Sequence, residues 1–172
     1  MSKGHLAVCG MTQSGTSYLA KALAGRALKA GRPVLVLDPF LYGDWPCSWI
    51  TKDPEAFMRK AKASTGCLLV VDECGVTIGR GVEARGKEWL VTASRHQGHR
   101  AMLLAQRATQ IEPIFRDNIS ELFLFAVYKD SAEIWAETFN DDALRTAPGL
   151  RKYHFLHKEL FKPCVHYPPI GV

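Results

Sequence analysis

The sequence predicts an α/β domain of three layers, in which helices cover both faces of a mostly parallel central sheet. Three observations indicate this fold. Short apolar runs alternate with helical stretches, a glycine-bounded loop joins the first apolar run to the first helix, and acidic or polar residues directly follow several apolar runs. Such alternation is typical of βαβ units, and ligands in these sheets bind at the carboxyl ends of the strands.

The composition is that of an ordinary globular protein. Of the 172 residues, 47% are hydrophobic and 23% are charged, and the formal net charge is +5. No apolar run approaches the roughly 20 residues that a membrane span requires. We therefore expect a cytosolic protein without a signal peptide and with its five cysteines reduced. The length predicts one domain over residues 1–172, with a core over about 5–157 and a proline-rich tail over about 158–172.

Apolar runs predict five buried strands, followed by an edge strand, at residues 6–9, 34–37, 67–71, 101–105, 122–127 and 153–156. Helical spacing and capping residues predict helices over 17–30, 54–63, 84–97, 113–118 and 131–139, with a further turn or short helix over 141–145. Segments rich in glycine or aromatic residues predict loops at 39–52 and 74–83. The tail is expected to run extended along the surface.

The loop after the first strand has the spacing of a phosphate-binding loop, or P-loop: Gly10, four residues, Gly15, one residue, Ser17. Glycines allow a tight turn whose N–H groups point at phosphate oxygens, and the helix that begins near Gly15 adds its positive dipole end. The Ser17 hydroxyl is placed to bind Mg²⁺. We expect ATP to be held by Gly10, Met11, Thr12, Gln13, Ser14, Gly15, Thr16, Ser17 and Tyr18.

Thr16 departs from this motif, which has lysine at that position to reach the β- and γ-phosphates. The backbone cradle survives the change, but the point charge does not. No nearby lysine obviously replaces it, because Lys3 precedes the first strand and Lys21 lies more than one turn along the helix. The alternative is an ordinary strand–turn–helix connection with no bound nucleotide.

The segment LLVVDE at 68–73 is typical of a Walker B strand. Asp72, at the end of the strand, can hold the hydration shell of Mg²⁺, and Glu73 can polarise a water for attack on the γ-phosphate. The interval of about 55 residues from the P-loop suits this pairing. The alternative is a buried strand that simply ends in solvent-exposed acidic residues.

Gln106 ends the next strand in the same way. In a parallel sheet this position lies between the P-loop and the acidic pair, where an amide could sense the γ-phosphate or position water. A glutamine that only caps a helix is the alternative. The sequence offers Tyr128, Tyr153 or His154 to stack on the base and gives no way to choose among them.

Taken in order, the degenerate P-loop, VVDE, RHQGHR, LLAQ and IEPIFRDN resemble the FtsK–HerA group of P-loop ATPases over roughly residues 5–128. The resemblance implies ATP hydrolysis with Mg²⁺, coupled to movement of double-stranded DNA in virus or phage genome packaging. It also implies a homo-oligomer, usually a hexamer, with capsid or portal proteins as further partners and action in the host cytoplasm or at a virion vertex. An arginine from a neighbouring subunit would complete the site, and the candidates are Arg95, Arg100 and Arg116.

A cationic stretch over residues 76–116 carries seven lysines and arginines against three glutamates. Mobile cations of this kind bind the DNA backbone without reading bases, and the candidates here are Arg80, Arg85 and Lys87. A solvated charged loop is the alternative.

Two other functions fit the same residues. A degenerate P-loop domain could serve as a non-catalytic assembly subunit, as Thr16 suggests. A phage assembly or export ATPase of the zonula occludens toxin type would normally carry a membrane span, which this sequence lacks.

Overall fold

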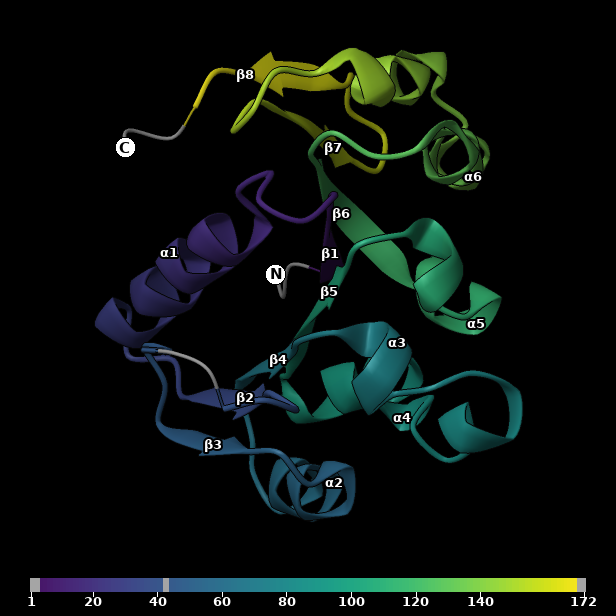
Figure 1. Cartoon of the computed structure of the whole chain (residues 1–172). Coiled ribbons are helices and arrows are strands. Elements are labelled where there is room, and N and C mark those ends of the chain that lie inside the picture. The colour runs from purple at the N-terminus through teal and green to yellow at the C-terminus, as the bar shows by residue number, and fades with distance from the viewer. Residues whose placement is uncertain (1–3, 42–43, 170–172) are drawn as a thin grey trace.

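The computed structural model describes residues 4–41 and 44–169, and its strands form one twisted sheet (Figure 1). The eight strands lie in the order β3-β2-β4-β5-β1-β6-β7-β8. Their bounds are β1 His5–Cys9, β2 Val34–Leu37, β3 Trp49–Thr51, β4 Leu68–Val71, β5 Arg100–Ala105, β6 Ile119–Leu124, β7 Phe155–Glu159 and β8 Val165–Tyr167. Strands β1 to β6 are parallel, and β7 and β8 are antiparallel additions at one edge. The prediction of a mostly parallel sheet is confirmed.

Helices cover both faces of this sheet, which makes the three predicted layers (Figure 1). Helix α1 (Thr16–Lys29) lies alone on one face. The other face carries α2 (Pro54–Lys62), α3 (Cys74–Thr77), α4 (Trp89–Thr92), α5 (Pro113–Arg116) and α6 (Lys129–Phe139). Each face has its own core, and β4 contributes to both: Leu68 and Val70 pack on the α1 side, while Leu69 and Val71 pack on the other. Burial on both faces explains why the parallel strands read as continuous apolar runs.

The predicted helix over 84–97 is wrong. The chain there forms three short pieces, the 3₁₀ helix η1 (Gly81–Ala84), α4 and the 3₁₀ helix η2 (Ser94–Gln97). Gly86 has φ 81°, a left-handed conformation that interrupts any α-helix at that point. The Ser94 hydroxyl then donates to the Leu90 carbonyl, a local bond that competes with helix continuation. The predicted loop at 74–83 was also partly wrong, because it begins with α3.

The edge strands were the other elements that the sequence did not predict. β3 lies within the predicted loop at 39–52, and β8 lies within the tail, which therefore pairs with the sheet. Both have three residues, and neither buries a side chain fully. The expected edge strand at 153–156 occurs two residues later as β7, and the expected strand at 122–127 begins earlier as β6. Two further 3₁₀ helices are η3 (Ala108–Gln110) and η4 (Asp142–Gly149).

The strand order brings three candidate segments to one edge of the sheet. β5 lies between β1 and β4, with Cys9 level with Ala105 and Val71 level with Leu103. Because these strands are parallel, the P-loop, the Asp72–Glu73 pair and Gln106 all follow carboxyl ends at the same edge. Among the residues that the structure describes, no helix is long and apolar enough to cross a membrane.

Candidate nucleotide-binding site

The loop between β1 and α1 has the backbone of an anion-binding turn. Gly15 has φ 115° at the N-cap of α1, and Gln13 also lies in the left-handed region with φ 63°. Because the N-cap residue is Gly15, it has no side chain that could cap the first turn of α1. The N–H groups of a helix start therefore remain available to a ligand, and the dipole favours an anion there.

Gly10 is required for a different reason from the tight turn that the sequence suggested. A Cβ at this position would lie 2.6 Å from Phe125 Cβ, 2.6 Å from Ser14 Oγ and 2.9 Å from Thr16 Cγ2. The start of the loop is thus packed against the segment after β6. The same distances show that Thr16 directs its methyl group across the loop towards Gly10.

A pocket of about 330 Å³ opens on one side of the P-loop. Its lining comes from Gln13, Gly15, Thr16, Ser17, Tyr18, Lys152 and Tyr153. The Tyr153 N–H donates to the Ser14 carbonyl at 3.1 Å, which ties the segment before β7 to the loop. The Ser14 hydroxyl is buried without a partner among the residues described. A cradle that leaves a buried hydroxyl unsatisfied fits a loop whose ligand would be an anion.

The acidic pair lies at the end of β4, as predicted. Asp72 Oδ1 accepts from the Glu73 N–H at 2.9 Å, and Glu73 adopts φ 46° at the N-cap of α3. A left-handed conformation is costly for a non-glycine residue, and such strain clusters at functional sites. Here it turns the Glu73 side chain out of the strand direction, towards β5.

Burial raises the pKa of Asp72 to about 6, although the hydrogen bond from the Glu73 N–H acts to lower this pKa. The negative charges of Asp38 and Glu73 raise it further, while the charge of Lys21 lowers it. Asp38 ends β2 and is itself buried, accepting from Trp45 Nε1 at 3.2 Å. A half-buried carboxylate with two acidic neighbours and a raised pKa fits a site for a divalent cation.

We therefore expect Asp72→Asn to stabilise the protein in the absence of Mg²⁺ and nucleotide. With a folded pKa of about 6 and an ordinary value of 3.8, ionised Asp72 destabilises the folded state above pH 6. Linkage sets an upper limit of about 3 kcal/mol on this destabilisation of the folded state, and the partial exposure of Asp72 reduces the expected value to about 1–2 kcal/mol. Urea unfolding should show this gain at pH 8, and the gap should close as the pH falls from about 6 to about 3.8. Asp44→Asn, at an exposed position, is the control. Equal stability of Asp72→Asn and wild type at pH 8 would contradict the assignment.

Gln106 meets the acidic pair as the sequence predicted. Its Nε2 donates to Glu73 Oε1 at 3.3 Å. Gln106 also lines a second pocket of about 350 Å³, with Met11, Thr12, Arg107, Gln110 and Tyr128. The P-loop therefore contributes residues to two pockets, and Gln106, the partner of Glu73, lines the second.

No family model matches the sequence, and no curated protein matches it. Among solved structures, the genome packaging NTPase B204 from Sulfolobus turreted icosahedral virus 2, in complex with AMP, aligns with a TM-score of 0.81 at 19% identity over 99% of both chains. The chain has the fold of a genome-packaging NTPase.

Two further structures support this identification of the fold. B204 from Sulfolobus turreted icosahedral virus, described as a DNA-packaging ATPase, aligns with a TM-score of 0.77 at 18% identity over 99% of this chain and 100% of that chain. VirB4 of Thermoanaerobacter pseudethanolicus aligns with a TM-score of 0.73 at 9% identity over 98% of this chain and 90% of that chain. The packaging-NTPase fold expected from the resemblance is thus confirmed over nearly the whole chain.

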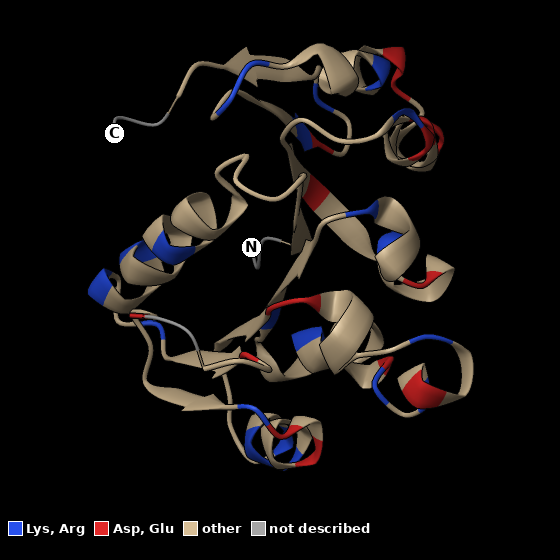
Figure 2. Cartoon of the chain, viewed as in Figure 1, with Lys and Arg blue, Asp and Glu red and all other residues tan. Residues whose placement is uncertain are grey.

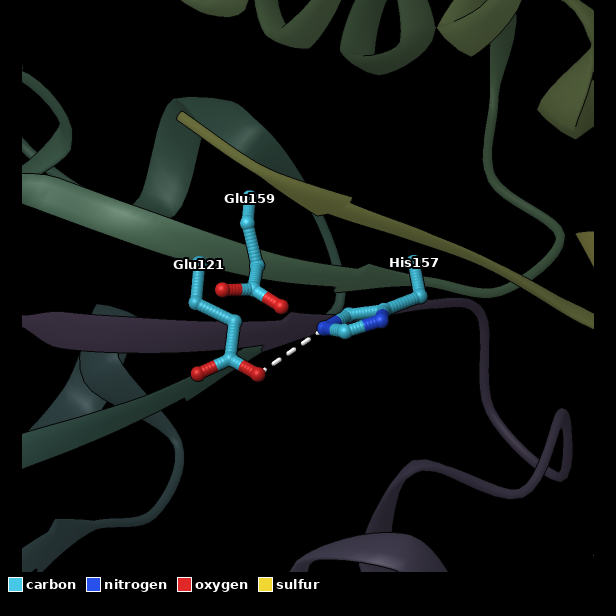
Figure 3. A group of neighbouring side chains, drawn as sticks. All are labelled: Glu121, His157 and Glu159. Carbon is cyan, nitrogen blue, oxygen red and sulfur yellow. Dashed lines mark hydrogen bonds and ion pairs between the residues drawn. The ribbon is translucent and has the colours of Figure 1, made fainter. Parts of the chain in front are cut away.

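Within this packaging-NTPase fold, Arg100 lies away from the nucleotide edge. It begins β5, whereas Gln106 follows the end of that strand. Its guanidinium pairs with Glu121 and donates to the Gly4 carbonyl. His157 Nε2 lies 2.8 Å from the other oxygen of Glu121, and Glu159 lies beside them (Figure 3).

These side chains form a network at the amino-end side of the sheet. Burial raises the pKa of Glu121, but the hydrogen bond with His157 and the charge of Arg100 outweigh it and hold the pKa at about 2. The ligand atoms of Glu121, His157 and Glu159 lie within 4.8 Å of one another. Each already has a protein partner, since Glu159 pairs with Lys162 at 2.8 Å. The geometry therefore places Arg100 in a stabilising ion pair, and its role as a trans-acting arginine stays a prediction.

We expect Arg100→Met to lower the free energy of unfolding at pH 7 by about 2–3 kcal/mol, because it leaves a mostly buried carboxylate with one partner fewer. The folded pKa of Glu121 lies below its ordinary value of 4.5, so this stabilisation is full above pH 4.5 and is lost as the pH falls towards about 2. Chemical unfolding against pH measures both effects, with Arg26→Met, exposed on α1, as the control. A variant of unchanged stability that binds ATP but has lost turnover would instead support Arg100 as the trans-acting arginine.

The other predicted cations differ in availability. Arg95 is exposed on η2 and stays a candidate finger. Arg116 is half-buried and donates to the carbonyls of Ala108 and Ile111, which commits it to the turn around η3. Lys87 donates from Nζ to the Thr77 and Ile78 carbonyls at 3.2 and 2.7 Å. Lys87 therefore stabilises the end of α3, and its contact with DNA stays a prediction.

Arg80 and Arg85 remain exposed, although Arg80 lies 3.8 Å from a carboxylate oxygen of Glu112. Figure 2 shows basic and acidic segments close together on the loop that follows α3. The stretch is thus a mixed surface with two exposed arginines rather than a uniformly cationic one.

The three aromatic candidates also separate. Tyr153 lines the first pocket together with Ser17. Tyr128 lines the second pocket, where the Arg107 guanidinium carbon lies 4.0 Å from the centre of the Tyr128 ring. His154 pairs with His166 at 3.1 Å between ring nitrogens. The positions of Arg107 and Lys152 beside the loop were not predicted. Arg107 could have been noticed because it follows Gln106, but Lys152 carries no sequence signal of its own.

Proposed function

We propose that this chain is the ATP-hydrolysing subunit of a motor that moves double-stranded DNA into a virus or phage particle. The observation that carries the proposal is the meeting of Glu73 and Gln106, 3.3 Å apart, beside a P-loop at one edge of a packaging-type fold. B204, which has this fold over its full length, has been described in complex with AMP, AMPPCP and ATP-gammaS.

In this proposal the triphosphate lies against the P-loop, and Mg²⁺ is held by Ser17 and Asp72. The exposed hydroxyl of Ser17 on the first turn of α1 and the raised pKa of Asp72 support that pair. Bound Mg²⁺ would neutralise charge on the β- and γ-phosphates. Glu73 would take the proton of the attacking water, and Gln106 would hold Glu73 and sense the γ-phosphate.

The motor would be a homo-oligomer, which we propose is a hexamer, in which a neighbour's arginine completes each site. Arg95 is the exposed candidate among those that the sequence offered. We place its action in the host cytoplasm or at a virion vertex, with capsid or portal proteins as partners. DNA would pass along surfaces that include Arg80 and Arg85.

The direct test is the rate of ATP hydrolysis with and without double-stranded DNA, at protein concentrations that permit assembly. We expect Mg²⁺-dependent hydrolysis that duplex DNA stimulates. ATP binding without turnover under all conditions would instead support a non-catalytic assembly subunit, for which the absence of the P-loop lysine at Thr16 is the specific argument.

We also expect sequence-independent DNA binding whose affinity falls steeply between about 50 and 200 mM salt, because bound cations release counterions from the duplex. The double variant Arg80→Ala/Arg85→Ala should reduce the slope of log affinity against log salt by about 2. The charge-matched control is Arg26→Ala/Lys29→Ala in α1, where both residues are exposed. Binding that ignores salt, or equal slopes for the two double variants, would remove Arg80 and Arg85 from the DNA path.

A further inference from the structure

A P-loop without its lysine must obtain positive charge elsewhere if it is to bind a triphosphate tightly. Among the residues that the structure describes, three cations near the loop have different partners. Arg107, in the second pocket, pairs with Asp130 at 3.3 Å and covers the ring of Tyr128. Lys21 lies close enough to Asp72 to lower its pKa, and its ammonium lies 5.6 Å from the Trp45 ring centre. Both charges are therefore partly neutralised by carboxylates.

Lys152 differs from both. Over residues 4–41 and 44–169, no carboxylate lies within ion-pair distance of its ammonium, which instead lies 4.8 Å from the ring centre of Tyr153. Lys152 is exposed and lines the pocket of about 330 Å³ together with Thr16 and Ser17. An unpaired lysine beside uncapped helix N–H groups adds its charge to the same anion-binding region.

The backbone fixes this lysine beside the loop. Tyr153 adopts φ 66°, a strained conformation for an aromatic residue, and its N–H donates to the Ser14 carbonyl at 3.1 Å. Its ring packs on the loop as well, because a Cβ at Gly15 would lie 3.0 Å from Tyr153 Cδ1. Because contacts with the P-loop keep Tyr153 in this strained backbone conformation, the segment that carries Lys152 has a fixed position beside the loop.

We propose that Lys152 binds the phosphates of the bound nucleotide and supplies the positive charge that Thr16 does not. The inference rests on the proposed function, since it requires a nucleotide on the P-loop. It assigns this positive charge to the segment just before β7. Lys152 and Tyr153 of that segment both line the pocket beside the P-loop.

The test is the dissociation constant of Mg-ATP for the assembled protein, measured by calorimetry. Lys152→Met keeps a long side chain and removes the charge. We expect it to weaken binding about 10- to 100-fold, the loss for one charge-assisted contact. Arg151→Met, a neighbouring exposed position outside the pocket, should change affinity less than twofold. Arg107→Met should cost less than Lys152→Met, because Arg107 already has a carboxylate partner.

Combination with Thr16→Lys decides whether Lys152 compensates for Thr16. In the Thr16→Lys background, Lys152→Met should cost less than about threefold, because the motif lysine then supplies the charge. An equal loss in both backgrounds, or wild-type affinity in Lys152→Met, would overturn the inference and leave the proposed function intact. No binding of ATP by the wild type at millimolar concentration would be a failure of the proposed function itself.

Discussion

Glu73→Gln is expected to lower the ATPase rate at least about 100-fold while leaving Mg-ATP affinity within about threefold, since a positioned general base contributes roughly 10²–10⁴ to the rate. Glutamine has the size of glutamate and can keep the contact with Gln106, whose Nε2 lies 3.3 Å from Glu73 Oε1. What it cannot do is accept a proton from water. The expected signature is therefore a loss in kcat without a loss of binding.

Two measurements make this result specific. Steady-state hydrolysis gives the rate, and calorimetry with Mg-ATP gives the affinity of the same preparation. Glu83→Gln, an exposed glutamate on η1, is the matched control and should hydrolyse ATP at the wild-type rate. Wild-type turnover by Glu73→Gln would show that Glu73 is structural, and its strained backbone at φ 46° would then need another explanation.

Much of this site could be predicted because its parts are local in sequence. The P-loop lies within eight residues, and Asp72, Glu73 and Gln106 each directly follow an apolar run. In a parallel sheet such residues must meet at one edge, and the order β4-β5-β1 makes them neighbours. The strand alternation predicted the core sheet for the same reason.

The positions of Arg100 and Gln106 show what strand direction adds to a sequence motif. Arg100 precedes β5 and Gln106 follows it, so the two lie at opposite ends of one buried strand. Reading the direction of the strand would have separated them, although the pairing of Arg100 with Glu121 comes from a strand that is distant in sequence. Lys152 could not be predicted, because its segment is brought to the loop by contacts between residues distant in sequence: the hydrogen bond from the Tyr153 N–H to the Ser14 carbonyl and the packing of the Tyr153 ring.

The errors in secondary structure have a similar origin. The helix expected over 84–97 had suitable apolar spacing, but the left-handed conformation of Gly86 outweighs that spacing. The strands β3 and β8 are short and lie at the edges, where a strand needs no apolar run because it buries little surface. Periodicity therefore predicted elements that build the core and missed elements that only extend the sheet.

Thr16→Lys is the second substitution for which we expect a large effect, and it should tighten Mg-ATP binding. Thr16 already directs its side chain across the loop, since its Cγ2 lies 2.9 Å from the position of a Cβ on Gly10. Lysine at this site can extend from the same Cβ to the phosphates, and it suits a helix start as well as threonine does. Charge-assisted hydrogen bonds contribute roughly 1.5–3 kcal/mol each, or about 10- to 100-fold in affinity.

With Lys152 in place we expect the lower end of that range for Thr16→Lys, about a tenfold tightening of Mg-ATP binding, together with faster hydrolysis. Thr16→Met adds a similar stem without the charge and should give no gain in affinity, which separates electrostatics from packing.

Unchanged or weaker binding by Thr16→Lys would mean that another cation occupies the lysine position, and Arg95 of a neighbouring subunit would be the first to test. If neither Thr16→Lys nor the wild type bound ATP at millimolar concentration, the loop would no longer be a nucleotide site. The protein would then be a structural subunit that retains the packaging fold, and the left-handed Glu73 would be a remnant of its chemistry.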